Sequence, residues 1–371
     1  MKRNILGTTT KSALNYGDIA INKQQWNTFT SEQMARYKND VFAYYRQCGF
    51  PYYTLNRQEK KAKLRALFNY YDRNRFINNG VVRQTMHGLS LAWSYHPHSW
   101  EVRCGTMRTP MEVFESDTLF HKAIEKRLLY GDNMTVAGIR KTLRTCSGTQ
   151  GVSNFRPTAA ASIYDYFLPE EGGTVWDQSC GFGGRLLGAL TSSKAKKYYG
   201  TDPSIPTWEG LQNMQRELVP MAAELGRKHL EVEIHPCGSE VPEVREFIPP
   251  GSLDLCFTSP PYFDTEKYEV YSPDSRQSYI RYPSKELWLT GFMKQTLQNC
   301  HYGLKSTGTL VINIARVRSY PKLAEDFVAI ATASGFRLVR TLQMELSKMM
   351  GTRGKDKNTH KLEPIFVFNR S

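Results

Sequence analysis

From about residue 174 onward, short apolar runs alternate with helical patterns, and this alternation constrains the fold more than any other feature of the chain. Such alternation is typical of a parallel sheet whose crossover helices cover both of its faces. The predicted strands span residues 174–177, 197–202, 231–235, 253–258, 309–314, 336–343 and 364–369. The predicted helices between them span residues 184–190, 208–225, 285–299 and 322–333. The pattern therefore predicts a doubly wound α/β domain with a mostly parallel, seven-stranded sheet.

The first part of the chain lacks this alternation and mixes aromatic with basic residues, as in the run from Phe68 to Phe76. We expect a separate, mainly helical module over residues 1–146, followed by the α/β domain over residues 147–371. Ser116 predicts the start of a helix that ends at Leu129, and Thr135 predicts the start of another through Leu143. Two helices joined around Gly131 fit a helix-turn-helix or an ordinary helical hairpin.

The positive charge is concentrated in the same part of the chain. Residues 1–150 hold 23 Lys and Arg against 11 Asp and Glu, a net charge of +12, while residues 151–371 hold 26 against 24. A concentrated positive field suits a polyanion such as double-stranded DNA, although surplus basic residues also serve solubility. The residues expected to contact DNA are Lys60, Lys61, Lys63, Arg65, Arg73 and Arg75.

Other features indicate the class of protein by what the sequence lacks. No apolar run approaches the roughly 20 residues of a membrane helix, and the first residues do not resemble a secretory signal, so we expect a cytoplasmic protein with no membrane partner. The seven cysteines form no Cys-x-x-Cys pair. A metal site is not expected, because the one histidine cluster, His96-Pro97-His98, has no further ligands nearby in the sequence.

A glycine-rich turn begins at Asp177, directly after a predicted strand, and reads Asp-Gln-Ser-Cys-Gly-Phe-Gly-Gly. Glycines there let the backbone turn tightly and approach a ligand at the carboxyl end of a strand. About 25 residues on, Asp202 ends the next predicted strand, where a carboxylate can accept hydrogen bonds from a ribose. Together the two features predict a nucleoside-containing cofactor, whereas the turn alone would fit an ordinary strand-to-helix connection.

The predicted strand 253–258 ends in the sequence Ser-Pro-Pro-Tyr, residues 259–262. Two prolines cannot continue a central strand, because they lack N–H donors and have a fixed φ, so they predict a rigid loop. This loop presents the Ser259 hydroxyl and the Pro260 carbonyl as acceptors beside Tyr262, which can stack on a base. Acceptors that hold both N–H bonds of a base amino group direct its lone pair towards a methyl donor.

In this order, the motifs resemble those of the amino-group DNA methyltransferases, the N4-cytosine and N6-adenine enzymes, over residues 153–371. The segment Asn-Phe-Arg-Pro-Thr, residues 154–158, resembles their methionine-side segment. The turn at Asp177 resembles their Asp-Pro-Phe-x-Gly-x-Gly pattern, with Gln178 and Ser179 in place of Pro and Phe. Gly238 and Ser239 stand where an acidic residue commonly reaches the adenine of the cofactor.

The resemblance implies S-adenosylmethionine as the cofactor and a list of site residues. The residues implied for cofactor binding are Phe155, Pro157, Thr158, Asp177, Ser179, Gly181, Gly183, Asp202, Gly238 and Ser239. Those implied for catalysis are Ser259, Pro260, Pro261 and Tyr262. In this family Ser at the first loop position occurs more often with N4-cytosine, which favours N4-methylcytosine as the product and leaves N6-methyladenine as the alternative.

Only about 75 residues separate the glycine turn from Ser259, so a sequence-reading module has to lie elsewhere, with residues 1–146 as the candidate. Residues 263–288 are rich in Tyr and charged residues, which fits either a loop over the pocket or a solvent-exposed surface loop. An RNA base or protein methyltransferase and a silent DNA-binding protein remain alternatives. A carbon-5 cytosine enzyme would need a nucleophile such as Cys237, and would leave the Ser-Pro-Pro-Tyr loop unexplained. A cognate restriction nuclease is not identified by the sequence.

Overall fold

The computed structural model describes residues 19–129, 133–146, 148–268, 276–346 and 361–371. The chain forms two compact units, Met1–Tyr52 with Thr106–Gly151, and Tyr53–Gly105 with Val152–Ser371. This division differs from the predicted boundary after residue 146. The cause is packing, because side chains from residues 53–105, such as Leu64 and Leu91, share one apolar core with the α/β sheet.

The α/β unit is built on a nine-stranded, mostly parallel sheet with the order β1-β2-β10-β11-β9-β7-β4-β5-β6. All seven predicted strands are present, as β4 (Gly173–Asp177), β5 (Ala195–Thr201), β6 (Glu231–His235), β7 (Leu253–Thr258), β9 (Leu304–Asn313), β10 (Phe336–Glu345) and β11 (Leu362–Arg370). The prediction of seven strands was incomplete, since the hairpin β1 (Ile77–Asn78) and β2 (Val81–Val82) extends the sheet beside β10. Strands of two residues carry no periodicity that a sequence pattern can reveal.

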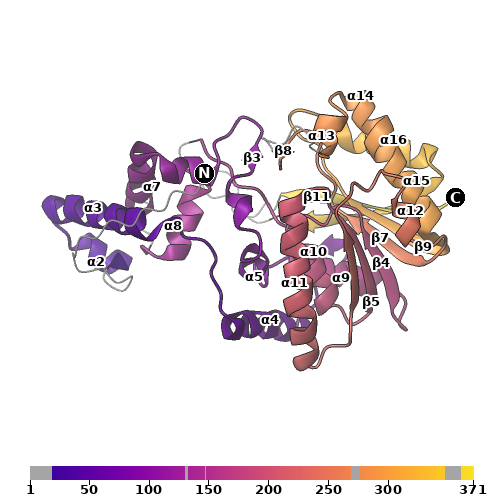
Figure 1. Ribbon diagram of the computed structural model, residues 1–371, viewed down its shortest axis with the longest axis horizontal. Coiled ribbons are helices and arrows are strands. Elements are labelled where there is room, and N and C mark those ends of the chain that lie inside the picture. Colours follow the sequence, from indigo (N-terminus) through magenta and orange to yellow (C-terminus); the bar gives the residue numbers. More distant parts are fainter. Residues whose placement is uncertain (1–18, 130–132, 147, 269–275, 347–360) are drawn as a thin grey trace. The chain divides into compact units, whose positions relative to one another are not determined.

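Helices cover both faces of the sheet, which confirms the doubly wound arrangement (Figure 1). One face packs against α4 (Arg57–Asp72), α5 (Leu89–Trp93), α9 (Pro157–Phe167), α10 (Gly184–Thr191) and α11 (Ile205–Glu224). The other packs against α12 (Val244–Phe247), the π-helix η2 (Trp288–Met293), α15 (Lys294–Gly303) and α16 (Leu323–Ala333). Shorter elements are η1 (Pro97–Trp100), α13 (Ser278–Arg281), α14 (Lys285–Leu287) and the two-stranded pair β3 (Arg103–Cys104) and β8 (Glu266–Lys267).

The other unit is helical throughout its described elements, which are α2 (Lys23–Asn27), α3 (Ser31–Cys48), α6 (Pro110–Glu115), α7 (Asp117–Leu129) and α8 (Val136–Leu143). The predicted start of α8 is confirmed, since the Thr135 hydroxyl accepts a hydrogen bond from the Gly138 amide at 3.0 Å. Gly131, the predicted end of the preceding helix, lies outside the described residues. Across the described part of the whole chain, no helix is both long enough and apolar enough to cross a membrane.

Candidate functional site

The three motifs singled out in the sequence meet at one edge of the sheet. The glycine turn follows β4, Asp202 follows β5, and Ser259 follows β7. These strands are parallel neighbours, with β4 paired to β5 on one side and to β7 on the other. The chain therefore changes direction of winding at β4, and such a switch point at the carboxyl edge is where open α/β sheets bind ligands.

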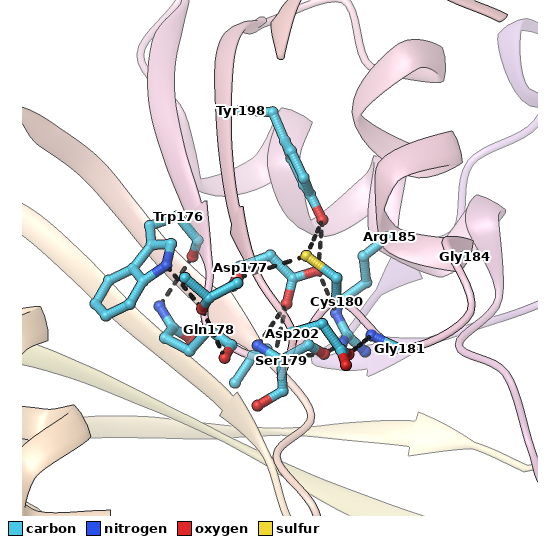
Figure 2. A network of polar contacts seen from close by, with 12 residues as sticks. Trp176, Asp177, Gln178, Ser179, Cys180, Gly181, Gly184, Arg185, Tyr198 and Asp202 are labelled. Atoms are coloured by element: carbon cyan, nitrogen blue, oxygen red, sulfur yellow. Dashed lines mark hydrogen bonds and ion pairs between the residues drawn. The ribbon is translucent and has the colours of Figure 1, made fainter. Parts of the chain in front are cut away.

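The glycine turn rests on a buried polar network centred on Asp177. Its Oδ2 accepts hydrogen bonds from Arg185 Nε at 2.8 Å and from the Tyr198 hydroxyl at 2.6 Å, and its Oδ1 accepts one from Thr258 Oγ1 at 2.8 Å. Figure 2 shows the Arg185 and Tyr198 side chains converging on this carboxylate. Arg185 also donates to the carbonyl of Ser179. Asp177 is fully buried, and through these hydrogen bonds it supports the glycine turn, while the cofactor contact expected for it stays a prediction.

Asp202, which follows β5, accepts a hydrogen bond from the backbone of the same turn. Its Oδ2 accepts a hydrogen bond from the Gly181 amide at 2.9 Å, and its Oδ1 accepts one from the Ser204 amide at 3.1 Å. Gly181 has a φ of 56°, and a Cβ added there would meet nothing within 4 Å, so there is free space next to the turn at this residue. Burial raises the pKa of Asp202 to about 7, although the two amide hydrogen bonds oppose the rise.

The segment predicted to contact the methionine side lies against the glycine turn. The Phe155 ring packs edge-on against Phe257, with 5.4 Å between centroids, next to the loop that follows β7. A Cβ at Gly184 would come within 1.9 Å of the Phe155 carbonyl oxygen, so the close approach requires glycine. Thr158 is fully buried, and its hydroxyl accepts a hydrogen bond from the Thr85 amide at 3.1 Å, so this side chain holds residues 85 and 158 together. Pro157 is buried at the start of α9.

Asn154 is a site residue that the predictions did not include. Its Nδ2 donates to the Phe182 carbonyl at 2.9 Å, and its Oδ1 accepts from the Gly184 amide at 3.2 Å. This buried side chain therefore ties the segment before α9 to the glycine turn. The sequence signal was its place at the head of the segment, but its two partners are nearly 30 residues away along the chain.

The loop after β7 places Ser259 and Tyr262 as a pair. Ser259 Oγ donates to the Tyr262 hydroxyl at 3.5 Å, and the Tyr262 hydroxyl donates to the carbonyl of Asn313 at 3.2 Å. Asn313 ends β9, so the loop is anchored to the next strand of the sheet. Burial, and then the charge of Glu363, raise the pKa of Tyr262, which keeps its phenol neutral. Pro260 is buried, while Ser259 and Pro261 are half-buried at the edge.

At the end of β6 the structure changes the expected roles of Gly238 and Ser239. The Ser239 side chain is 2% exposed and its hydroxyl bonds Thr296 Oγ1 at 2.9 Å, so it faces α15. A Cβ at Gly238 would lie 2.1 Å from Oε2 of Glu240, a buried acid that the sequence analysis missed. Glu240 pairs with Arg281 at 3.0 Å.

The described part of the 263–288 segment packs back onto this unit. Arg276 Nη1 donates to the Pro236 carbonyl at 3.0 Å, and Arg281 of α13 forms the ion pair with Glu240. The end of this segment therefore covers the edge beside β6, whereas Tyr271 and its neighbours at 269–275 lie outside the described residues. Burial, and then Glu240, raise the pKa of Cys237 to about 12, which disfavours the thiolate that a carbon-5 mechanism needs.

The residues predicted to contact DNA fall into two groups. Lys60 and Lys61 lie on α4 and form ion pairs with Glu217 and Glu224 of α11, at 2.6 and 2.7 Å. These two lysines therefore hold α4 against α11, which differs from the role predicted for them. Lys63 is half-buried, and the exposed members of the set are Arg65, Arg73 and Arg75.

The charge of the predicted module is divided between the two units. Residues 53–105 hold nine Lys and Arg against three Asp and Glu, a net charge of +6, and they belong to the α/β unit. The segments 1–52 and 106–151 together hold 14 against 8, also a net charge of +6. Both units therefore carry a positive surplus, which the sequence analysis had assigned to one module.

No protein-family model matches the chain, and no curated protein matches its sequence. Its fold is similar to a TehB-like SAM-dependent methyltransferase from Corynebacterium glutamicum, with 15% identity over 59% of this chain and 90% of that chain and a TM-score of 0.34. A SAM-dependent methyltransferase from Methanosarcina mazei is 12% identical over 56% and 96% of the two chains, with a TM-score of 0.36. A SAM-dependent O-methyltransferase from Thermotoga maritima is 10% identical over 59% and 67%, also with a TM-score of 0.36. The function is therefore argued from the site.

Proposed function

We propose that this protein is an S-adenosylmethionine-dependent methyltransferase that modifies an exocyclic amino group of a base in DNA. The observation that carries the proposal is the meeting of the glycine turn, Asp202 and the Ser259–Tyr262 loop at the switch point of one parallel sheet. The first two suit a nucleoside cofactor, and the third suits a flat substrate with an amino group. S-adenosylmethionine supplies a methyl group on a sulfonium, and the chain supplies the positions of the reacting groups.

The loop can direct the amino nitrogen without forming a covalent bond to the base. Ser259 Oγ and the Pro260 carbonyl accept the two N–H bonds, which concentrates the nitrogen lone pair towards the methyl group. The Tyr262 ring, held at its hydroxyl by Asn313, offers a flat surface for the base. To reach this loop, a base has to leave the duplex, as in other enzymes that act on bases. Orientation and electrostatics in a dry pocket then supply the rate enhancement.

We propose N4-methylcytosine as the product, with N6-methyladenine as the alternative, because the first loop residue is the neutral Ser259. Mass spectrometry of nucleosides from DNA of cells that express the protein tests this directly. An increase in N4-methylcytosine supports the proposal. An increase in N6-methyladenine alone would mean that the target base is adenine and not cytosine. Methylated RNA with unmodified DNA would instead identify an RNA base methyltransferase.

Cofactor binding should weaken as the pH falls through about 7. The ionised Asp202 carboxylate accepts hydrogen bonds from a ribose more strongly than the neutral acid, and its pKa of about 7 means that the proton is taken up below that pH. Asp202→Asn should weaken S-adenosylmethionine binding about tenfold at pH 8, because one acceptor oxygen of the carboxylate is replaced by an NH2 donor. Isothermal titration calorimetry from pH 5.5 to 8.5 measures both effects.

The control is the pH profile of the variant itself. In Asp202→Asn the dissociation constant should no longer change around pH 7, because the titrating group is gone. A wild-type profile without that change, or an unchanged dissociation constant in the variant, would contradict the role of Asp202. No binding of S-adenosylmethionine by the wild type would favour a silent fold that only binds DNA.

DNA affinity should depend on the exposed Arg73 and Arg75. If these side chains contact phosphates, replacing both with Glu should weaken binding and reduce the log–log salt slope by about 0.9 for each lost phosphate contact. Fluorescence anisotropy with a labelled duplex between 50 and 300 mM salt gives both quantities.

A matched double variant elsewhere on the surface distinguishes a phosphate contact of Arg73 and Arg75 from the effect of net charge alone. Lys322 precedes α16 and Lys294 lies in α15, both on the face of the sheet opposite α4, and Lys322→Glu with Lys294→Glu changes the net charge by the same amount. Equal losses of affinity in both double variants would show that Arg73 and Arg75 make no specific contact. Lys60 and Lys61 are unsuitable for this test, because their replacement breaks ion pairs to α11.

A further inference from the structure

Methyl transfer to an amino nitrogen leaves a proton that the Ser259 loop by itself does not accept. The nitrogen lone pair forms the N–C bond, the C–S bond breaks, and its electron pair stays on the sulfur. The cofactor becomes a neutral thioether and the nitrogen becomes a cation, which has to lose a proton. A serine hydroxyl and a proline carbonyl are neutral and are poor bases, so the site needs a carboxylate or a comparable group.

Several carboxylates around this edge are already held by donors. Asp177 accepts from Arg185 and Tyr198 within the network beneath the turn. Asp202 accepts from two backbone amides, and Glu266 accepts from the Tyr268 hydroxyl and the Ser153 amide. Each of these acids has a structural task in the free protein.

Asp264 differs from them, and it lies two residues after Tyr262 in the same loop. Its Oδ1 is buried and has no hydrogen-bond partner among the described residues. A buried carboxylate oxygen without a donor is costly, and such a group needs an explanation in a folded protein. A methylated, cationic nitrogen that gives up a proton to this oxygen would provide one.

The backbone holds Asp264 in place at some cost. Phe263 has a φ of 56°, in the left-handed region that residues other than glycine rarely adopt. Thr265 closes the turn, since both its amide and its hydroxyl donate to the Tyr262 carbonyl, at 3.2 and 2.7 Å. The Phe263 ring is 8% exposed and packs edge-on against Trp288 and Tyr320. Strained backbone of this kind is concentrated at functional sites.

We infer that Asp264 is the proton acceptor of the methyl-transfer reaction. This inference rests on the proposed function. After methyl transfer, the Asp264 carboxylate takes one proton from the methylated nitrogen, whose other N–H stays with a loop acceptor, and it passes that proton to water after the product leaves. The strained turn at Phe263 fixes the backbone of this carboxylate in the same loop, five residues after Ser259.

The test compares the wild type with Asp264→Asn in single-turnover assays with S-adenosylmethionine carrying a tritiated methyl group and unmethylated genomic DNA. The variant should lower the rate of methyl transfer about 100-fold, as expected for loss of a general base. The dissociation constant for S-adenosylmethionine should stay unchanged. Glu286→Gln is the matched control, because Glu286 is an exposed carboxylate of the same 263–288 segment, and this variant should keep the wild-type rate.

Chemical rescue distinguishes a proton acceptor from a structural residue. In Asp264→Ala, sodium formate should raise the rate of methyl transfer at least tenfold, whereas sodium chloride at the same ionic strength should not. A wild-type rate in Asp264→Asn, or variants that bind cofactor but gain nothing from formate, would overturn the assignment of Asp264. Absence of methyl transfer by the wild type to DNA and RNA would instead overturn the proposed function, and this inference with it.

Discussion

Replacing Ser259 with alanine should lower the rate of methyl transfer by roughly 100-fold, the typical effect of removing one preorganised polar group from a catalytic site. The hydroxyl is one of two proposed acceptors for the base amino group, and the remaining Pro260 carbonyl cannot orient the nitrogen alone. The loss should fall on kcat, because the group is needed most when the nitrogen changes its geometry. Tritium transfer to DNA at saturating cofactor measures it.

Ser252 provides the matched control for this variant. It stands before β7, at the opposite end of the strand from Ser259, and its hydroxyl donates only to the nearby Pro249 carbonyl at 2.7 Å. Ser252→Ala should therefore keep the full rate. If Ser259→Ala also retained it, with cofactor binding intact, the Ser-Pro-Pro-Tyr loop would not be the site that holds the amino group.

Replacing Asp177 with alanine should lower the free energy of unfolding of the α/β unit by about 3–5 kcal/mol, as is found when one partner of a buried ion pair is removed. The Arg185 side chain is 5% exposed and the Asp177 side chain 0%, so the variant leaves a buried guanidinium without its carboxylate. The Tyr198 and Thr258 hydroxyls lose an acceptor as well. Urea unfolding followed by tryptophan fluorescence reports on this unit, which contains five of the six tryptophans.

An exposed ion pair of the same unit shows how much of that loss comes from burial. Lys194 and Glu170 are 2.6 Å apart, but the Glu170 side chain is 90% exposed. Glu170→Ala should cost less than about 1 kcal/mol, because Glu170 is solvated and the Lys194 ammonium keeps its hydrogen bond to the Leu168 carbonyl. A similarly small change in Asp177→Ala would mean that the network in Figure 2 does not support the turn.

The place of the glycine turn and of Asp202 at one edge of the sheet was predictable, because both follow strands that were themselves recognisable. Asp202 and Gly181 are 21 residues apart, yet both end up at the carboxyl edge of neighbouring parallel strands, where they share a 2.9 Å hydrogen bond. Asp177 was predicted to contact the cofactor, and in the structure its carboxylate accepts hydrogen bonds from three protein side chains. Whether a carboxylate in a glycine turn faces a ligand or the interior depends on its partners, here Arg185 and Tyr198. No local sequence pattern predicts that these two side chains contact it.

The sequence by itself determined the sheet, its helices and the edge at which the motifs meet, because apolar periodicity and strand-ending glycines and prolines act over a few residues at a time. Tertiary structure alone decided what residues 53–105 do. Their apolar side chains join the core beneath the sheet, and Lys60 and Lys61 of this segment pair with Glu217 and Glu224, more than 150 residues away. Burial and pairing of that kind depend on which surfaces fold together, so a charge count along the chain could not separate anchoring lysines from the exposed Arg73 and Arg75.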